Sequence, residues 1–400
     1  MIVESRLDAL LDSFVGAGVP GCALSVFYRG KEVYTGYRGF ADIEAGQKIN
    51  ENTLYRIASC TKNITATAVM TLFEQGRILL NDAVSDYLPS FKKISYQTLD
   101  GSGEIVTKRT SGPLTIKHLL TMTSGIPYMG KGSLTSSAYL DSIGTMSDMY
   151  KFTLQELAEK ISKVPLDFDP GSHWRYGMSY DVLGAVVEAV TGVRFSDYLQ
   201  KTIFDPLDME HTTFYCSKEM EKQLAKIYCF KDGKHIYFPR EPNITESNGN
   251  KLESGGGGLL STVGDMARFA SMWAQSGVFE GKRILGSQTI QLMRKNHLSG
   301  CAMEDFKRMS NEAYPWYKGY GWGLAGRTMV SCEEAGSNGN TGEFGWCGAF
   351  GPYIIADPEA ELAVAYAQQM FPTIGGMQDY CHPRVRNAVY ALLDEFKWIA

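Results

Sequence analysis

The sequence predicts an α+β fold in which strands from both ends of the chain form one sheet, with a mainly helical lobe inserted between them. Strand-like segments lie near the N-terminus, helical spacing dominates the middle, and strands return before a last helix. An isolated two-stranded hairpin is at best marginally stable in water, so the economical arrangement pairs the N-terminal hairpin with the C-terminal strands. We expect a sheet domain from residues 1–78 and 258–400 and a helical lobe from residues 79–257. Ligands favour the cleft between two such lobes.

The N-terminal region begins with an amphipathic helix and a hairpin. The leucines at 7, 10 and 11 and Phe14 lie on one side of the helix. Residues 21–43 predict two strands around a turn at Arg29-Gly30-Lys31. Apolar residues with helical spacing then predict a helix from about Ser59 to Gln75, and Gly76 is a natural C-terminal stop.

The rest of the chain follows the same reasoning from hydrophobic periodicity. Two stretches rich in Gly, Ser and charge, 100–112 and 231–257, are predicted to be long loops. Further helices are expected at 116–122, 154–160, 180–191, 195–203, 263–275, 287–294 and 384–398. Strands are expected at 319–330, 343–350, 353–356 and 362–368.

Composition excludes several classes of function. Of 400 residues, 44% are hydrophobic and 21% are charged, which is typical of a globular protein and not of a disordered one. With 39 Lys+Arg and 44 Asp+Glu the net charge is -5, so no basic face for nucleic acid is expected. The longest basic runs, such as Lys92-Lys93, are short and predict solvated loop charge.

The sequence predicts no membrane-spanning segment, no metal site and no cofactor. No stretch approaches the roughly 18 apolar residues of a membrane span, and residues 1–6 lack the basic and apolar regions of a signal peptide. The eight cysteines are scattered without CxxC, which fits reduced thiols and a cytoplasmic location. The six histidines lie far apart without HExxH, so no metal site is suggested.

Ser59-Cys60-Thr61-Lys62 is the sharpest local motif. Its S-x-x-K spacing at the start of a helix places Ser59 and Lys62 side by side on one face. Free N–H groups at a helix N-terminus stabilise an alkoxide, and a neutral lysine could take the serine proton. The alternative is a Ser N-cap beside a surface lysine, because S-x-x-K often occurs by chance.

Two further segments are candidates for the same site. Tyr176, in Tyr176-Gly-Met-Ser179 before a helix, could act as a general base if neighbouring cations lower its pKa. Trp346-Cys-Gly-Ala349 lies in a strand punctuated by glycine, where a ligand could approach the backbone closely. A packed aromatic residue and an ordinary core strand are the alternatives.

Other patterns argue against nucleotide binding and against the α/β-hydrolase fold. Gly321-Trp-Gly-Leu-Ala-Gly326 matches GxGxxG but lies inside an apparent strand without a following helix. The run Gly255–Gly258 lacks GK[ST], and the chain has no GxSxG motif.

The order of Ser59-x-x-Lys62, the Tyr176 segment and the Gly348 strand resembles the penicillin-recognising serine hydrolases, related to class C β-lactamases. Other segments over residues 5–395 agree with that family: 115–126, 169–176, 181–188, 206–209 and 255–262. The resemblance implies the β-lactamase/transpeptidase-like fold, an antiparallel sheet flanked by helices with a helical lobe.

The resemblance also implies roles for individual residues. Ser59 is the expected nucleophile, Lys62 handles its proton, and Tyr176 is the general base or acid. The backbone N–H groups of Ser59 and Ala349 form the expected oxyanion hole. The implied reaction is acyl transfer through a covalent acyl-enzyme.

Two departures from the family pattern decide the predicted substrate. Met178 stands where β-lactamases and peptidases usually have Asn, and Trp346-Cys347-Gly348 replaces Lys-Thr-Gly or His-Thr-Gly. The missing cation removes a partner for the carboxylate of penicillins and D-alanyl peptides. Tryptophan there resembles the esterase branch, the family VIII carboxylesterases and related acyltransferases. We therefore expect hydrolysis or transesterification of a small-molecule ester, with Trp346, Gly348 and Met178 contacting the substrate.

Two alternatives stay open at this point. One is a low-activity β-lactamase or D-amino-acid peptidase that cleaves an amide. The other is a non-catalytic ligand-binding relative, although serine, lysine and tyrosine are all retained.

Overall fold

The structure, a computed structural model, describes residues 2–130, 132–238, 250–371 and 377–400. Its centre is an eight-stranded sheet in the order β12-β13-β14-β15-β16-β1-β2-β3, with every neighbouring pair antiparallel. The strands are β1 (Gly21–Tyr28), β2 (Lys31–Asp42), β3 (Gln47–Lys48), β12 (Tyr320–Trp322), β13 (Arg327–Met329), β14 (Phe344–Gly345), β15 (Tyr353–Asp357) and β16 (Leu362–Gln368).

The predicted joining of the two ends of the chain is confirmed at the centre of this sheet. β1 pairs with β16 along its length, with Val26 opposite Val364. β1 also pairs with β2 through a tight turn in which Arg29 and Gly30 have φ of 53° and 75°. Two successive positive φ values give the turn that matches the twist of a hairpin.

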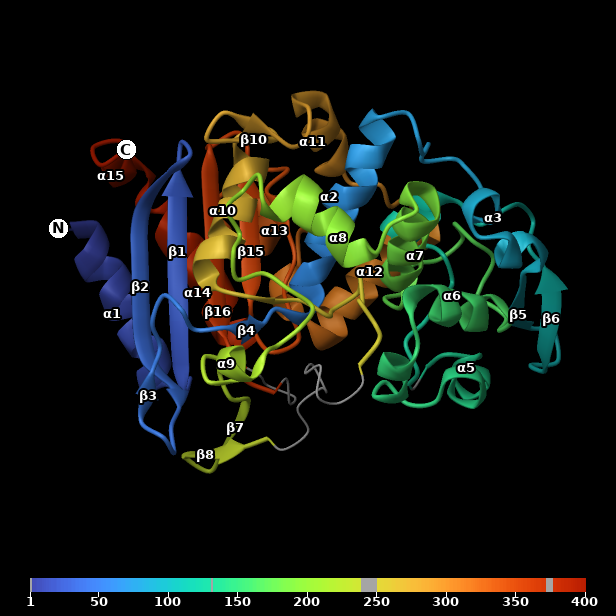
Figure 1. Cartoon of the computed structure of the whole chain (residues 1–400), viewed down its shortest axis with the longest axis horizontal. Coiled ribbons are helices and arrows are strands. Elements are labelled where there is room, and N and C mark those ends of the chain that lie inside the picture. The colour runs from blue at the N-terminus through green and yellow to red at the C-terminus, as the bar shows by residue number, and fades with distance from the viewer. Residues whose placement is uncertain (1, 131, 239–249, 372–376) are drawn as a thin grey trace.

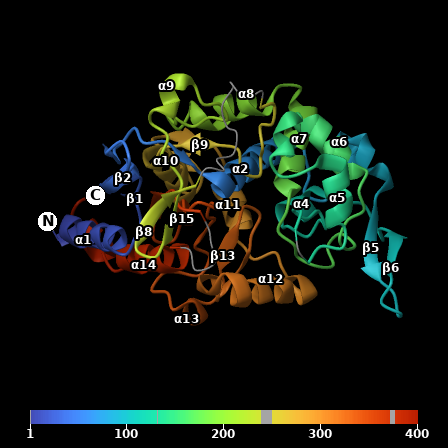
Figure 2. The ribbon, with the colours of Figure 1, turned by 90° about the horizontal axis from the view of Figure 1, so that it is seen from below.

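Helices cover both faces of the sheet (Figures 1 and 2). α1 (Ile2–Gly16), α14 (Gln378–Tyr390) and α15 (Leu393–Phe396) lie on one face, and α10 (Val263–Ala274) lies on the other. α1 buries Leu7, Leu11 and Phe14, as its apolar stripe predicts. The protein therefore has the α+β class and the antiparallel sheet that the sequence predicts.

α2 (Thr61–Glu74) is the central helix of the molecule. Every residue from Thr61 to Leu72 is buried, including four threonines and Lys62, because α2 packs between the sheet layer and α7 (Ser179–Thr191). Thr65 and Thr67 donate their hydroxyls to carbonyl oxygens one turn earlier in the helix, and Thr67 also accepts the indole N–H of Trp273 on α10 at 3.1 Å. The N-terminus of α2 is thus held in a fixed place.

The middle of the chain is mainly helical and lies beside the sheet (Figure 1). It contains α3 (Val84–Tyr87), α4 (Ile116–Leu120), α5 (Ser136–Ile143), α6 (Leu154–Ser162), α7 and α8 (Phe195–Leu199), whereas α9 (Lys218–Glu221) lies over the sheet (Figures 1 and 2). Residues 223–228 run along the sheet side instead, where Ala225 N–H donates to Leu54 and Tyr228 N–H donates to Gln369. The division into two domains at 78/79 and 257/258 stays a prediction.

Several predicted loops and strands differ in the structure. Residues 95–109 form a hairpin, β5 (Ser95–Leu99) and β6 (Ile105–Arg109), where much of 100–112 was expected to be loop. Within 231–257, β8 (Lys234–Tyr237) pairs with β7 (Tyr228–Lys231), and residues 239–249 of that predicted loop lie outside the described residues. The side chains of these hairpins are mostly exposed. Neither hairpin therefore shows the alternation of apolar and polar residues on which strand prediction relies.

The C-terminal half also departs from prediction. Residues 319–330 are a hairpin of β12 and β13, and the strand expected at 343–350 is regular only over β14. α12 (Gly300–Ala313) was not predicted, and the closing helix α14 begins six residues earlier than expected, at Gln378. α10 and α11 (Ser287–Met293) match prediction closely.

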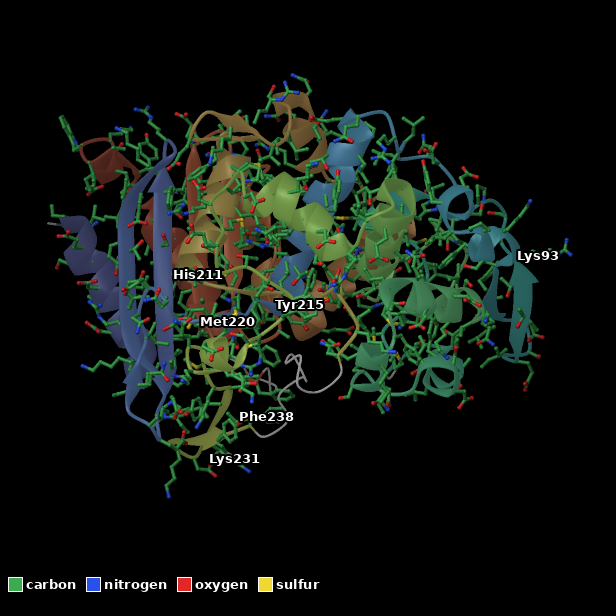
Figure 3. The ribbon with its side chains drawn as sticks, in the orientation of Figure 1. Lys93, His211, Tyr215, Met220, Lys231 and Phe238 are labelled. Carbon is green, nitrogen blue, oxygen red and sulfur yellow. The ribbon has the colours of Figure 1, made fainter. Side chains whose placement is uncertain are left out.

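Lys93 and the cysteines can be placed in the described part of the chain. Lys93 points outward at the end of the molecule farthest from the N-terminus, as Figure 3 shows, and is exposed. All eight cysteines are unpaired. Within the described ranges, no helix is both long and apolar enough to cross a membrane.

Candidate active site

Ser59 lies in a strained turn that leads into α2. β4 (Tyr55–Arg56) pairs with β9 (Leu260–Ser261), and a 3-10 turn at Ala58–Cys60 then joins β4 to the helix. Ala58 has φ of 44°, which costs an L-residue about 1–2 kcal/mol. Strained backbone of this kind clusters at functional sites, where the surrounding structure holds it in place. Ser59 is partly exposed, whereas Cys60 is buried.

Lys62 is fully buried, and its amine contacts three oxygen atoms. The Nζ atom lies 3.2 Å from Ser59 Oγ, 3.1 Å from Tyr128 Oη and 2.6 Å from the carbonyl oxygen of Gly256. A neutral amine has two N–H groups and one lone pair. If the carbonyl of Gly256 and the hydroxyl of Tyr128 accept the two N–H groups, the lone pair faces the hydroxyl of Ser59.

Burial lowers the pKa of Lys62 to about 8, and the carboxylate of Asp181 opposes that change. The Nζ atom also lies 4.7 Å from the ring centre of Tyr176. A lysine with this pKa is partly neutral near physiological pH, which suits a proton acceptor.

Asp181, on the first turn of α7, fixes the loop that holds Lys62. Its Oδ1 accepts the hydroxyl of Ser254 at 2.5 Å and the N–H of Gly256 at 3.2 Å. Burial raises the pKa of Asp181, while these hydrogen bonds and the charge of Lys62 lower it. A side chain at Gly256 would collide with this carboxylate, because an added Cβ would lie 2.7 Å from its Oδ2.

Tyr176 lies beside both Ser59 and Trp346. The hydroxyl of Ser59 favours the ionised form of Tyr176, and the indole N–H of Trp346 donates to Tyr176 Oη at 2.8 Å. Burial raises the pKa of Tyr176 well above its usual value. The idea that neighbouring cations lower that pKa is therefore wrong: burial has the largest effect, the groups that lower the pKa are Ser59 and Trp346, and the phenol is neutral at neutral pH.

Residues 346–351 pass close to the Ser59 turn. An added Cβ at Gly348 would lie 2.2 Å from the carbonyl oxygen of Ile57, so only glycine fits. The N–H of Gly348 donates to Pro352 at 2.8 Å. The backbone N–H groups of Ser59 and Ala349, by contrast, have no acceptor within the described parts of the chain.

A small pocket of about 120 Å³ opens next to Ser59. None of the described residues that line it is an aspartate, glutamate, lysine, arginine or histidine. Trp346 forms one wall, with Tyr317 stacked on it at a centroid distance of 5.2 Å. The lining residues are Ser59, Trp174, Tyr176, Met309, Tyr314, Tyr317, Trp346, Cys347, Gly348, Ala349 and Gln378.

The structure brings most of the predicted site residues together. Lys62 contacts Ser59, while Ser59, Tyr176, Trp346, Gly348 and Ala349 all line the pocket. Met178 is completely buried at the N-cap of α7 and is not among the lining residues, so its contact with a substrate stays a prediction. The indole N–H of Trp346 is engaged by Tyr176, which leaves the ring to face the pocket.

Sequence reasoning missed several residues of this site. Tyr128 follows a Ser-Gly-Ile-Pro turn, and nothing local marks it as a partner of Lys62. Asp181 was noted only as part of a helix and of the family segment 181–188, with no role assigned to it. The run Gly255–Gly258 carried a usable signal, because consecutive glycines indicate close backbone approach. An added Cβ at Gly255 would indeed lie 2.4 Å from the carbonyl oxygen of Tyr180.

Comparisons with known proteins identify the family of this chain. The sequence model of the Beta-lactamase family matches residues 7–379. Esterase EstB of Burkholderia gladioli is 30% identical over 413 residues, covering 97% of this chain and 95% of EstB. Protein Rv1367c of Mycobacterium tuberculosis strain H37Rv is 29% identical over 364 residues, covering 88% of this chain and 86% of that protein.

Solved structures show the same fold. EstCE1, described as a hydrolase with promiscuous acyltransferase activity, superposes with a TM-score of 0.79 at 24% identity, covering 97% of this chain and 98% of EstCE1. Unliganded simvastatin synthase LovD from Aspergillus terreus gives 0.81 at 22% identity, covering 97% and 98%. With a family match over nearly its whole length and this serine-lysine-tyrosine cluster, the chain belongs to the Beta-lactamase family of serine hydrolases.

Proposed function

We propose that this protein hydrolyses or transesterifies small, neutral carboxylic esters through a covalent acyl-enzyme on Ser59. The observation that carries the proposal is the Ser59–Lys62–Tyr176 cluster beside a pocket whose described lining has no charged side chain. The relationship to esterase EstB supports an ester substrate.

The reaction begins when neutral Lys62 accepts the proton of Ser59. Ser59 Oγ then attacks the ester carbonyl, and the oxyanion forms beside the N–H groups of Ser59 and Ala349. Tyr176, a neutral phenol linked to Ser59, passes a proton to the departing alkoxide. The bond from Oγ to the acyl carbon forms as the bond to the alcohol oxygen breaks.

The second half of the reaction releases the acyl group. Water or an alcohol attacks the acyl carbon and gives its proton to the Tyr176 phenolate as the bond from the acyl carbon to Oγ breaks. Protonated Lys62 then returns a proton to Oγ, which restores free Ser59 and neutral Lys62. The mainly aromatic wall around Ser59 favours an apolar acyl chain and an organic acceptor. The description of EstCE1, a protein of the same fold, as a hydrolase with promiscuous acyltransferase activity is in keeping with both outcomes.

Ser59→Ala tests the proposal directly. Wild-type protein mixed with p-nitrophenyl butyrate should gain the mass of one butyryl group, which peptide mapping locates on Ser59. Ser59→Ala should keep its fold and lose essentially all turnover, since no other nucleophile replaces it. Near-wild-type esterase activity in this variant would disprove the assignment of the nucleophile.

Two further assays on the wild-type protein test the two alternative functions. Nitrocefin turnover well above ester turnover would favour a β-lactamase or amidase. Failure of a fluorophosphonate to label Ser59 would favour a non-catalytic binding protein.

A further inference from the structure

The first turn of α14 holds the backbone around Ala349. The side-chain amide of Gln378 donates from Nε2 to the carbonyl oxygen of Gly348 at 3.1 Å and to that of Ala349 at 2.8 Å. These two carbonyls belong to the peptide groups before and after Ala349. A single amide nitrogen therefore restrains both peptide planes of this residue.

The carbonyl of Gly348 and the N–H of Ala349 belong to the same planar peptide group, so holding the carbonyl also orients the N–H. The peptide between Gly348 and Ala349 is trans, so its C=O and N–H point in opposite directions. Two donors, Gln378 Nε2 and the N–H of Gly351 at 3.0 Å, hold the carbonyl of Gly348. The direction of Ala349 N–H is fixed by the same contacts, and this N–H has no acceptor within the described chain.

Gln378 and the first turns of α14 are packed in the core. Gln378 is 6% exposed and lines the pocket beside Ser59. One helical turn later, His382 Nε2 lies 2.9 Å from the carbonyl oxygen of Gly351, so it must be the donor. Burial lowers the pKa of His382 to about 3, which keeps the ring neutral. Its stacking on Tyr353, at a centroid distance of 4.3 Å, fixes this end of the helix against β15.

We propose that Gln378 is a positioning residue for the oxyanion hole: by holding both carbonyls that flank Ala349, it aims the N–H of Ala349 at the developing oxyanion. The inference rests on the proposed function, because it needs an acyl-transfer oxyanion next to Ser59. It gives α14, far from Ser59 in sequence, an indirect part in stabilising the transition state, exerted through the backbone of Ala349.

Gln378→Met tests the inference, because methionine keeps the length of the side chain and removes both donated hydrogen bonds. Removing an oxyanion donor outright costs about 10²–10³ in kcat. Misdirecting one should cost less, so we expect kcat for p-nitrophenyl butyrate to fall about 10- to 100-fold with KM changed less than about threefold. The infrared carbonyl stretch of a ¹³C-labelled butyryl-enzyme should move to higher frequency, because the carbonyl is less polarised.

Gln368→Met is the matched control. Gln368 is also a buried glutamine near this turn, and its Nε2 has no partner among the described residues. Its substitution should leave kcat and the carbonyl stretch unchanged. If Gln378→Met fails to fold, Gln378→Leu, whose side chain also has no hydrogen-bond donor, is measured instead against the same criteria.

The outcomes separate the two proposals. Absence of butyryl-Ser59 in the wild type would overturn the proposed function and this inference with it. A wild type that is acylated, with Gln378→Met showing wild-type kcat and carbonyl stretch, would overturn only the role of Gln378. So would an equal loss in Gln368→Met.

Discussion

The protonation of Lys62 should set how turnover depends on pH. Its amine must be neutral to accept the proton of Ser59, and burial lowers its pKa to about 8. Turnover should therefore rise as the pH increases through about 8. The carboxylate of Asp181 favours the charged amine, so removing that charge lowers the pKa of Lys62 further.

Asp181→Asn isolates this effect, since Asn keeps an oxygen that can accept from Ser254 and Gly256. We expect the rising limb of the kcat/KM profile to move to lower pH. The measurement is kcat/KM for p-nitrophenyl butyrate across the pH range, with correction for spontaneous hydrolysis. If the rising limb lies at the same pH in Asp181→Asn and in the wild type, Asp181 does not carry a negative charge beside Lys62.

Lys62 and Tyr176 should act as one proton-transfer unit. Both contact Ser59, and a positioned acid or base typically contributes about 10²–10⁴-fold. Lys62→Ala and Tyr176→Phe should each lower kcat by about that much. The double variant should be about as slow as the slower single variant, because residues that act together are not additive. Multiplicative losses would show two independent functions.

At the level of single residues, sequence spacing predicted the contact between Ser59 and Lys62, because both lie on one helical turn. It could not predict that Tyr128 and the carbonyl of Gly256 complete the surroundings of Lys62, since neither is near it in the chain. The sequence also could not predict that the pKa of Tyr176 is raised, because the direction of that change depends on how deeply the side chain is buried.

The close approach of the 346–351 segment to the Ser59 turn should be sensitive to one methyl group. In Gly348→Ala the new Cβ would meet the carbonyl oxygen of Ile57 at 2.2 Å, so the two segments must separate. A shift of about 1 Å in a catalytic group can cost roughly 10²-fold. We expect kcat for p-nitrophenyl butyrate to fall by about that factor.

Gly112→Ala is the control, because an added Cβ there meets nothing within 4 Å. Thermal unfolding of both variants separates a local shift from loss of fold. Wild-type kcat in folded Gly348→Ala would show that the contact with the Ser59 turn does not matter for turnover.

Among the elements, α2 and α10 were predictable from their periodicity, whereas α12 was not recognised. Its buried residues Ala302, Phe306 and Ser310 recur every four positions, but alanine and serine give a weak apolar signal. This omission mattered, because Met309 of α12 lines the pocket. The extent of the pocket wall could therefore not be read from the sequence.

For the molecule as a whole, the sheet built from both ends of the chain followed from the order of predicted elements. The pocket combines the start of α2, the loop before α7, α12, the 346–349 segment and the start of α14. Such a convergence is a property of the folded chain. The family resemblance predicted it for Ser59, Tyr176 and Trp346, but gave no indication of Tyr314, Tyr317 or Gln378.

The residues that line the pocket determine the predicted choice of substrate. Trp346 stands where related β-lactamases and peptidases have a cation, and its indole N–H is engaged by Tyr176. Loss of a charge-assisted hydrogen bond to a substrate carboxylate costs about 1.5–3 kcal/mol, or roughly 10- to 150-fold. The described pocket lining supplies no other charged group in compensation. Trp346→Lys should narrow the preference for neutral esters over anionic β-lactams.

The most direct measurement compares kcat/KM for p-nitrophenyl butyrate and for benzylpenicillin on the wild-type protein, with intact mass recorded for each reaction. A neutral-ester hydrolase acting through Ser59 should give an ester value at least about tenfold higher, the low end of the estimated discrimination. The butyryl group should appear on Ser59. Benzylpenicillin turned over faster than the ester would contradict this account and identify the protein as a β-lactamase.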